Sequence, residues 1–256
     1  MLLEIKDVHR SFGGLKVHRG LEIGVEAGVI FAVIGPNGAG KTTLFQMISG
    51  LLPPDKGDIR YRGSSLAGLE PHSIALAGIG RTFQTPQLFA DLTCLQNVMI
   101  GLHGRLKSGF LASGFRGRAL RREEDWARSE AMQILDYVGL KNQASMLAGA
   151  LPFGRQRLLE VGRAWAGKPN LLMLDEPAAG LNDVEIEGLK SLIRRMRAEG
   201  CTILLIEHHM GIVMDISDRI AVIHDGLCIS TGTPAHVQHD PKVIDAYLGR
   251  GRGRAA

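Results

Sequence analysis

Residues Gly35-Pro36-Asn37-Gly38-Ala39-Gly40-Lys41-Thr42 match the pattern G-x-x-x-x-G-K-[ST] at every position. The apolar run Val29–Ile34 precedes them and the helical run Thr43–Ile48 follows, which is the strand–loop–helix context of a phosphate-binding loop. Glycines let backbone N–H groups turn toward phosphates, and the following helix N-terminus adds partial positive charge. We expect Lys41 to reach the β- and γ-phosphates and the Thr42 hydroxyl to coordinate Mg²⁺. Together with Thr43, these residues predict a purine nucleotide site.

A second polar feature follows the apolar run Leu171–Leu174, which ends in the adjacent carboxylates Asp175 and Glu176. Because side chains alternate along a strand, neighbouring carboxylates diverge and can serve two ligands. We expect Asp175 to hold Mg²⁺, and Glu176 to orient or deprotonate the attacking water. Glu185 and Glu187, by contrast, fall on the polar face of a predicted helix and are expected in solvent.

The composition is that of a globular protein, since 45% of the 256 residues are hydrophobic and 22% are charged. The 33 glycines follow no G-X-Y period, which excludes collagen and favours loops that approach a ligand closely. Cys94, Cys201 and Cys228 form no CxxC pair, which argues against a disulfide framework or zinc site and favours a reducing compartment. No apolar run approaches the ~20 residues of a membrane span, so we expect any work at a membrane to depend on docking.

Basic residues exceed acidic residues by 30 − 26 = 4, and several of them form two clusters. One cluster is mid-chain and the other is on the C-terminal tail: Arg116, Arg118, Arg121 and Arg122, then Arg250, Arg252 and Arg254. Either cluster suits anionic lipid or nucleic acid. We favour the simpler interpretation, in which they are solvated surface charge and a frayed terminus.

Hydrophobic periodicity predicts an α/β core with a mostly helical insert. Short apolar runs predict strands at Leu2–Val8, Leu21–Val25, Val29–Ile34, Asp58–Arg62, Leu171–Leu174 and Thr202–Ile206. Helical spacing predicts helices over Gly154–Gly167 and Asp183–Glu199, and one through Ala127–Val138 that Gly139 ends. Asp225-Gly226, between Arg219–His224 and Leu227–Ser230, predicts a hairpin. We expect one domain, 1–249: core and β subdomain 1–84 and 151–232, helical subdomain 85–150, helical extension 233–249, and tail 250–256.

Further segments, in the expected order, resemble those of ATP-binding-cassette (ABC) ATPases, a class of P-loop NTPases. They are Arg81-Thr82-Phe83-Gln84, Leu151-Pro152-Phe153-Gly154-Arg155-Gln156-Arg157, Ala179-Gly180-Leu181-Asn182, His208 and Phe12. The resemblance implies a mixed β core with an antiparallel β subdomain and a helical subdomain. It also implies that Phe12 stacks on adenine, Gln84 senses the metal and the attacking water, and His208 contacts the γ-phosphate. The catalytic set is then Glu176, His208, Gln84 and Lys41, and the metal set Thr42, Gln84 and Asp175.

The segment at residue 151 resembles the family signature L-S-G-G-Q, which completes the ATP site of a partner subunit, but it departs from that pattern. Pro152 stands where a serine normally bonds the γ-phosphate, Phe153 and Gly154 follow it, and Arg155 replaces glutamine. Proline fits the first turn of a helix, where its N–H would be unpaired. Arg155 either approaches phosphate oxygens or points to solvent. Asn182 replaces the more common aspartate of the partner-facing loop.

A finer resemblance is to the ATP-binding subunits of branched-chain amino acid importers, carried by Gly13-Gly14-Leu15, Pro177–Asn182, Ile206-Glu207-His208 and the ending 232–249. It implies ATP and Mg²⁺, a second ATP-binding subunit (identical or sibling), two membrane permeases and an external solute-binding protein, at the cytoplasmic face of the inner membrane. Importers of urea, amides or aromatic acids share much of this pattern and stay open. A soluble ABC-type ATPase acting on nucleic acid is disfavoured by the single cassette, and a non-hydrolysing nucleotide sensor by the intact Lys41, Asp175 and Glu176. The absence of an N-K-x-D sequence argues against a GTPase.

Overall fold

The chain folds around two β-sheets in a computed structural model that describes residues 1–106 and 118–248. The first sheet is antiparallel, with strands in the order β2 (Leu15–Val25), β1 (Leu3–Phe12), β4 (Lys56–Tyr61) and β5 (Ser64–Ser65). The second has the order β10 (Leu227–Gly232), β9 (Arg219–His224), β3 (Ile30–Ile34), β8 (Thr202–Ile206), β7 (Leu171–Asp175) and β6 (Ile79–Arg81). Its strands β9 to β6 are parallel, and β10 joins β9 in a hairpin. Arg116 and the tail arginines lie outside the described residues.

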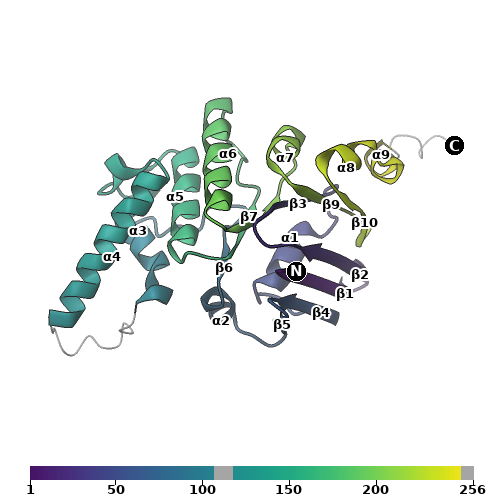
Figure 1. The fold of residues 1–256 in the computed structure, drawn as a ribbon, viewed down its shortest axis with the longest axis horizontal. Helices are drawn as coiled ribbons and strands as arrows, with labels where there is room; N and C mark the ends of the chain where they lie inside the picture. The colour runs from purple at the N-terminus through teal and green to yellow at the C-terminus, as the bar shows by residue number, and fades with distance from the viewer. Residues whose placement is uncertain (107–117, 249–256) are drawn as a thin grey trace.

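Helices cover the second sheet, and α1 lies between the two sheets (Figure 1). Their bounds are α1 Lys41–Ile48, α2 Pro71–Leu76, α3 Cys94–Gly101, α4 Arg118–Tyr137, α5 Phe153–Ala166, α6 Asp183–Ala198, α7 Met210–Ile216, α8 Pro234–His239 and α9 Pro241–Leu248. Figure 1 shows α3, α4 and α5 grouped beyond the β6 edge, and α8 and α9 beside the opposite edge at β10. Within residues 1–106 and 118–248, none of the helices combines the length and the apolar character that crossing a membrane requires.

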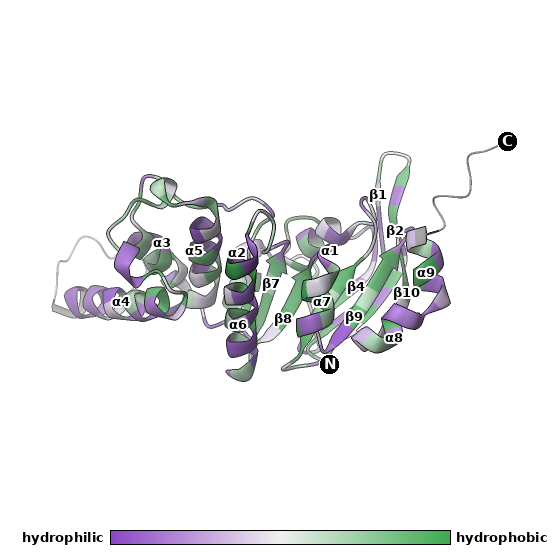
Figure 2. Cartoon of the chain, turned by 90° about the horizontal axis from the view of Figure 1, so that it is seen from above, coloured by the Kyte–Doolittle hydropathy of each residue, from purple (hydrophilic) through white to green (hydrophobic). Residues whose placement is uncertain are grey.

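The central strands β3, β7 and β8 are buried along their whole length because helices or the other sheet cover both faces. On β3, Phe31 and Val33 pack toward α1 and the antiparallel sheet, whereas Ile34 packs toward α7 and α8. On β7, Leu172 and Leu174 pack toward the helices that include α5 and α6. Figure 2 accordingly shows β7 and β8 in hydrophobic colours, and α4 and α6 with many hydrophilic residues.

This arrangement places the sequence motifs together at the carboxyl ends of the parallel strands. The phosphate loop follows β3, Asp175 ends β7 and Glu176 comes directly after it, His208 follows β8, and Gln84 follows β6. Since parallel strands end on the same side of a sheet, residues far apart in sequence meet there. The expected α/β fold, with a mixed central sheet, an antiparallel sheet and a helical region, is confirmed.

Most predicted elements are present, with shifts of a few residues at their ends. The Asp225-Gly226 hairpin is confirmed, because both residues have positive φ, 47° and 77°. Strands β1 and β2 are longer than predicted, since they form one hairpin around Gly13 that carries polar residues. Strand β6 and helices α2 and α7 were not predicted: each has seven residues or fewer, too few to establish a hydrophobic period.

Candidate nucleotide-binding and hydrolysis site

The phosphate loop has glycine where no side chain fits. A Cβ at Gly35 would lie 2.1 Å from the backbone oxygen of Ile223, so only glycine lets the chain leave β3 at this point. Gly40 precedes α1 with a left-handed φ of 92°, and a Cβ there would lie 2.7 Å from Cε1 of the buried His18. Both close approaches seat the loop tightly against the body of the protein, and the first turn of α1 contains no acidic residue that would oppose an anion.

Lys41 is held at the mouth of this loop. Its Nζ donates to the carbonyl oxygens of Gly35 at 2.7 Å and Pro36 at 3.0 Å, and the residue is 8% exposed. Burial lowers the pKa of Lys41, while the carboxylates of Glu176 and Asp175 favour its charged form. The exposed Asn37 and Gly38 form the rim of the loop, the buried Ala39 its floor, and the half-buried Thr42 and Thr43 the first turn of α1.

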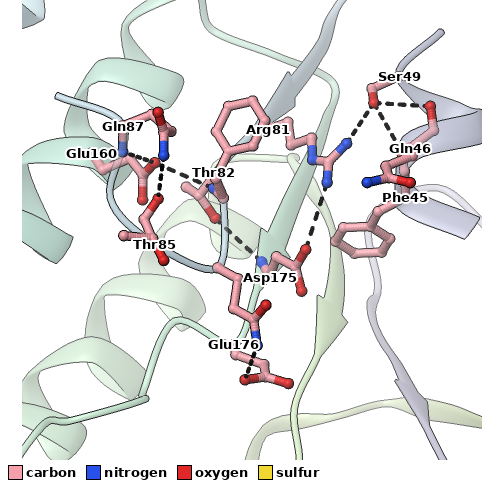
Figure 3. Close-up of polar contacts among 12 residues, drawn as sticks. Phe45, Gln46, Ser49, Arg81, Thr82, Thr85, Gln87, Glu160, Asp175 and Glu176 are labelled. Atoms are coloured by element: carbon pink, nitrogen blue, oxygen red, sulfur yellow. Dashed lines mark hydrogen bonds and ion pairs between the residues drawn. The ribbon is translucent and has the colours of Figure 1, made fainter. Parts of the chain in front are cut away.

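Asp175 ends β7 with its carboxyl group almost completely buried, at 1% exposure. Its backbone N–H donates to the Thr82 hydroxyl at 3.2 Å, and Nη2 of Arg81 lies 3.6 Å from Oδ2 (Figure 3). Burial raises the pKa of Asp175, and the guanidinium of Arg81 opposes the rise. Among the described residues, neither carboxyl oxygen has a hydrogen-bond partner. Two buried oxygens without donors are the chemistry that a hard divalent cation accepts, so the residues present fit the predicted magnesium ion.

Glu176 turns away from Asp175 and faces two other predicted residues. Its Oε2 accepts a hydrogen bond from Nε2 of Gln84 at 3.1 Å (Figure 3). The same oxygen lies 3.7 Å from Nδ1 of His208. The divergence of the two carboxylates was predicted for the wrong reason: β7 ends at Asp175, and Glu176 has a left-handed φ of 47° rather than the next strand position. A left-handed backbone is costly for a residue other than glycine, and such strain is concentrated at functional sites.

Arg81 has a structural position that its place in a motif did not reveal. Besides Asp175, it donates from Nη1 to the Ser49 hydroxyl at 2.7 Å, and its guanidinium stacks 4.9 Å from the ring centre of Phe83. One side chain thereby joins the end of α1, the end of β7 and the segment that carries Gln84 (Figure 3). The available signal was an arginine at the end of an apolar stretch, and it does not specify any of these partners.

The signature residues lie at the N-terminus of α5. Pro152 is the N-cap residue, one position before the predicted first turn, and the ring of Phe153 packs on Gly180 so closely that a Cβ there would lie 3.0 Å from Cε1. Arg155 donates from Nη1 to the carbonyl of Gly139 at 3.1 Å, so its guanidinium is turned toward the end of α4. None of these contacts goes to residues 35–43.

Glu185 is only partly in solvent, whereas full exposure was predicted. It is half-buried and forms a reciprocal capping box with Asn182 at the start of α6, with both bonds at 3.0 Å. Its carboxyl also stands 2.5 Å from where a Cβ of the signature residue Gly154 would be. Glu187, in contrast, lies on the surface as predicted, where it pairs with Lys190.

Phe12 is placed at the end of β1, beside the turn into β2. Its ring is 45% exposed, and the guanidinium of Arg10 lies 4.8 Å from the ring centre. An exposed aromatic ring at the turn of the β1–β2 hairpin is suited to stacking on a planar base.

Two protein families and several known proteins are similar to this chain. The family described as ABC transporter matches residues 18–179, and that described as branched-chain amino acid ATP-binding cassette transporter matches residues 228–252. A high-affinity branched-chain amino acid transport ATP-binding protein of Pseudomonas aeruginosa, BraF, is 44% identical over 97% of this chain and 98% of its own. The corresponding Escherichia coli protein, LivG, is 41% identical over the same shares. A nucleotide-free ATP-binding cassette from an ABC transporter superposes with a TM-score of 0.84 at 32% identity, covering 97% of this chain and 99% of that one.

Proposed function

This chain belongs to the ABC transporter family, and we propose that it binds and hydrolyses ATP to drive an importer of branched-chain or other hydrophobic amino acids. Hydrolysis is supported by the contacts of Gln84 and His208 with the Glu176 carboxylate. These contacts lie at the carboxyl ends of the parallel strands, where the phosphate loop also lies. The solute class is supported by the BraF and LivG relatives and by the second family match, at residues 228–252.

Residues 35–43 bind the triphosphate in this proposal, and Phe12 stacks on the adenine. Gly38 and Gly40 keep positive φ and direct backbone N–H groups inward, so that the loop acts as a nest for anionic oxygens. The ammonium of Lys41, already aimed across the loop by two carbonyls, contacts the β- and γ-phosphates. Its burial strengthens this contact because water screens the charge less.

The Thr42 hydroxyl and the Asp175 carboxylate would hold Mg²⁺, with Gln84 close to both the metal and the attacking water. When bound, Mg²⁺ neutralises part of the negative charge on the phosphate oxygens. Burial raises the pKa of Asp175, and the guanidinium of Arg81 opposes this rise and so favours the charged form that a metal ligand requires.

Hydrolysis is assigned to Glu176 as the base. Its carboxylate orients a water, accepts a proton from it as the water oxygen attacks the γ-phosphorus, and the bond from that phosphorus to the β–γ bridging oxygen breaks. Gln84 holds Oε2 of Glu176 and fixes the direction of the carboxylate. His208, with a side chain 61% exposed, is free to extend to the γ-phosphate.

A complete site requires a second ATP-binding subunit in this proposal. Pro152, Phe153, Gly154 and Arg155 lie at the start of α5, where the Phe153 ring packs on Gly180 and not on the phosphate loop of the same chain. As the resemblance to the family signature implies, they would contact ATP held by the partner, and Arg155 would have to leave the Gly139 carbonyl to do so. ATP would close the two subunits around two nucleotides. We place this pair beneath two membrane permeases at the cytoplasmic face of the inner membrane, with an external binding protein delivering the solute.

The test of the catalytic assignment is Glu176→Gln, which keeps the size of the side chain and removes the base. The variant should bind ATP as the unchanged chain does, release no phosphate, and run as an ATP-dependent dimer in light scattering. Glu187→Gln makes the same change on the exposed face of α6, so it is the matched control and should leave turnover unchanged. Turnover near the unchanged level in Glu176→Gln would remove Glu176 from its role.

The solute class has its own test. The chain is reconstituted in vesicles with the ATP-binding subunits and permeases that co-purify with it, and the external binding protein is added. Uptake of leucine, urea, a short aliphatic amide and benzoate is then compared in the presence of ATP. ATP-dependent uptake of leucine alone supports the proposal. Uptake of urea, amide or benzoate without leucine contradicts the amino-acid assignment while leaving the ATPase assignment intact.

A further inference from the structure

The segment 83–87, which contains Gln84, is hydrogen-bonded by two buried charged residues of α5, Arg157 and Glu160. Their side chains are 3% and 1% exposed. Arg157 donates from Nη1 to the carbonyl of Phe83 at 2.7 Å and from Nη2 to the carbonyl of Gln84. Glu160 accepts at Oε1 from the backbone N–H groups of Phe83 at 3.2 Å and Gln87 at 3.1 Å (Figure 3). Four charge-assisted bonds thus hold this short piece of backbone.

Burying these two charges is expensive, so the pair is a weak explanation of stability alone. The closest nitrogen and oxygen of Arg157 and Glu160 are 3.9 Å apart, longer than a good hydrogen bond, and Oε2 of Glu160 has no hydrogen-bond partner among the described residues. An apolar pair of similar size is often as stabilising as a buried ion pair. Apolar side chains, however, cannot bond the N–H and C=O groups of a segment that belongs to no helix or strand.

The segment 83–87 is connected to the hydrolysis site through Gln84. Arg157 bonds the main chain of Gln84, and the side chain of the same glutamine bonds Oε2 of Glu176 at 3.1 Å. The path from α5 to the catalytic carboxylate therefore passes through a single residue. This path begins near the signature. Arg157 is two residues after Arg155, the last signature position, and both lie in the first turns of α5.

We propose that Arg157 and Glu160 are positioning residues that fix Gln84 relative to α5, so that a movement of the signature end of α5 moves Gln84 against Glu176 in the same chain. The inference rests on the proposed function, in which the signature end of α5 meets the ATP held by a second subunit. Contact of the signature end of α5 with that ATP would then move α5, and the bonded segment that contains Gln84 would move with it at the hydrolysis site of this chain.

The test uses ATP hydrolysis by the full chain with Mg²⁺, measured as kcat and KM for four variants. Glu160→Ala removes both acceptor bonds. Arg157→Lys replaces the rigid two-nitrogen fork by a single ammonium, which cannot keep the geometry in which Nη1 and Nη2 each hold one carbonyl. Glu160→Gln keeps an amide oxygen at the position of Oε1 and is the conservative rescue. Arg105→Lys is the matched control, since Arg105 also bonds a backbone carbonyl and a glutamate but lies away from Gln84.

Glu160→Ala and Arg157→Lys should each lower kcat about tenfold to a hundredfold, because a shift of about 1 Å in a reacting group has effects of that size. The KM for ATP should change by less than about twofold, since the phosphate loop is untouched. Glu160→Gln should stay within about threefold of the unchanged chain, and Arg105→Lys should not differ from it. If Glu160→Ala fails to fold, Arg157→Lys carries the test.

Gln84→Ala separates positioning from a merely structural role. If Arg157 and Glu160 act through Gln84, their replacement should cause no further loss of kcat once Gln84 is alanine. The proposal is overturned by an equal loss in both backgrounds, by a kcat unaffected in Arg157→Lys, or by a fall in kcat matched by a rise in KM. The proposed function fails separately, by absence of turnover in the unchanged chain or by turnover in Glu176→Gln.

Discussion

Replacing Arg81 by methionine removes the counter-charge of a buried carboxylate, and we expect it to lower the free energy of unfolding by about 3 to 5 kcal/mol at pH 7. Arg81 and Asp175 have side chains 9% and 1% exposed, and their nearest nitrogen and oxygen are 3.6 Å apart. With an effective dielectric constant near 20, this separation corresponds to an attraction of roughly 4 to 5 kcal/mol. Methionine retains much of the arginine's apolar contact, so the loss should come mainly from the charge.

The loss should depend on pH, because burial already raises the pKa of Asp175 and Arg81 is the group that opposes this rise most. Without Arg81, the folded protein binds the proton of Asp175 more tightly still than the unfolded chain does. The uncompensated charge therefore destabilises the variant fully above the raised folded pKa. The penalty should shrink as pH falls through that value toward the ordinary pKa of about 3.9.

Denaturant unfolding followed by circular dichroism, at pH 7 and pH 4.5 without nucleotide, measures both effects. The difference between Arg81→Met and the unchanged chain should be smaller at the lower pH, and it should largely disappear when Asp175 is also replaced by asparagine. Arg60→Met breaks an exposed pair with Asp58 and should change stability little. An equal loss at both pH values, undiminished by Asp175→Asn, would refute the reasoning and assign the stabilisation to the other contacts of Arg81.

Gly35→Ala places a Cβ 2.1 Å from the Ile223 carbonyl and should weaken ATP binding at least tenfold in a nucleotide titration, whereas affinity equal to that of the unchanged chain would show that the loop can move aside. Asn182→Ala removes the side-chain cap of α6 and should cost about 1 kcal/mol in denaturant unfolding, so an unchanged midpoint would show that the cap is dispensable. Glu185→Gln removes the negative charge beside Gly154 and should strengthen ATP-driven dimerisation in light scattering, where weaker dimerisation would contradict repulsion of the partner's phosphates.

The phosphate loop was predictable because its conformation depends on neighbours in sequence. Glycines with positive φ, an apolar strand before them and a helix after them all lie within residues 29–48, so one local pattern specifies the site. The apolar strands β7 and β8 were readable for the same reason. Strand β6 was not, because its three residues are held by pairing with β7 and have no period of their own.

The meeting of Gln84, Glu176 and His208 was expected only through resemblance to a family. Nothing local to Gln84 indicates a partner that is 92 residues away. The left-handed turn at Glu176, which aims its carboxylate, precedes a proline and is not the conformation that strand alternation predicts. The capping box at Asn182 and Glu185 was locally readable, but the approach of Glu185 to Gly154 was not.

The amino-acid sequence alone determined the phosphate loop, the pair of carboxylates and the alternation of strands and helices, since each depends on residues within one short stretch. Tertiary structure alone decided which charges are buried together. Arg157 and Glu160 bond a segment that lies 73 or more positions away in the chain, and the strand end that holds Asp175 meets Thr82 across 93 positions. Such contacts arise because a charged side chain excluded from water must find its partners wherever the packing of the sheets and helices has brought them.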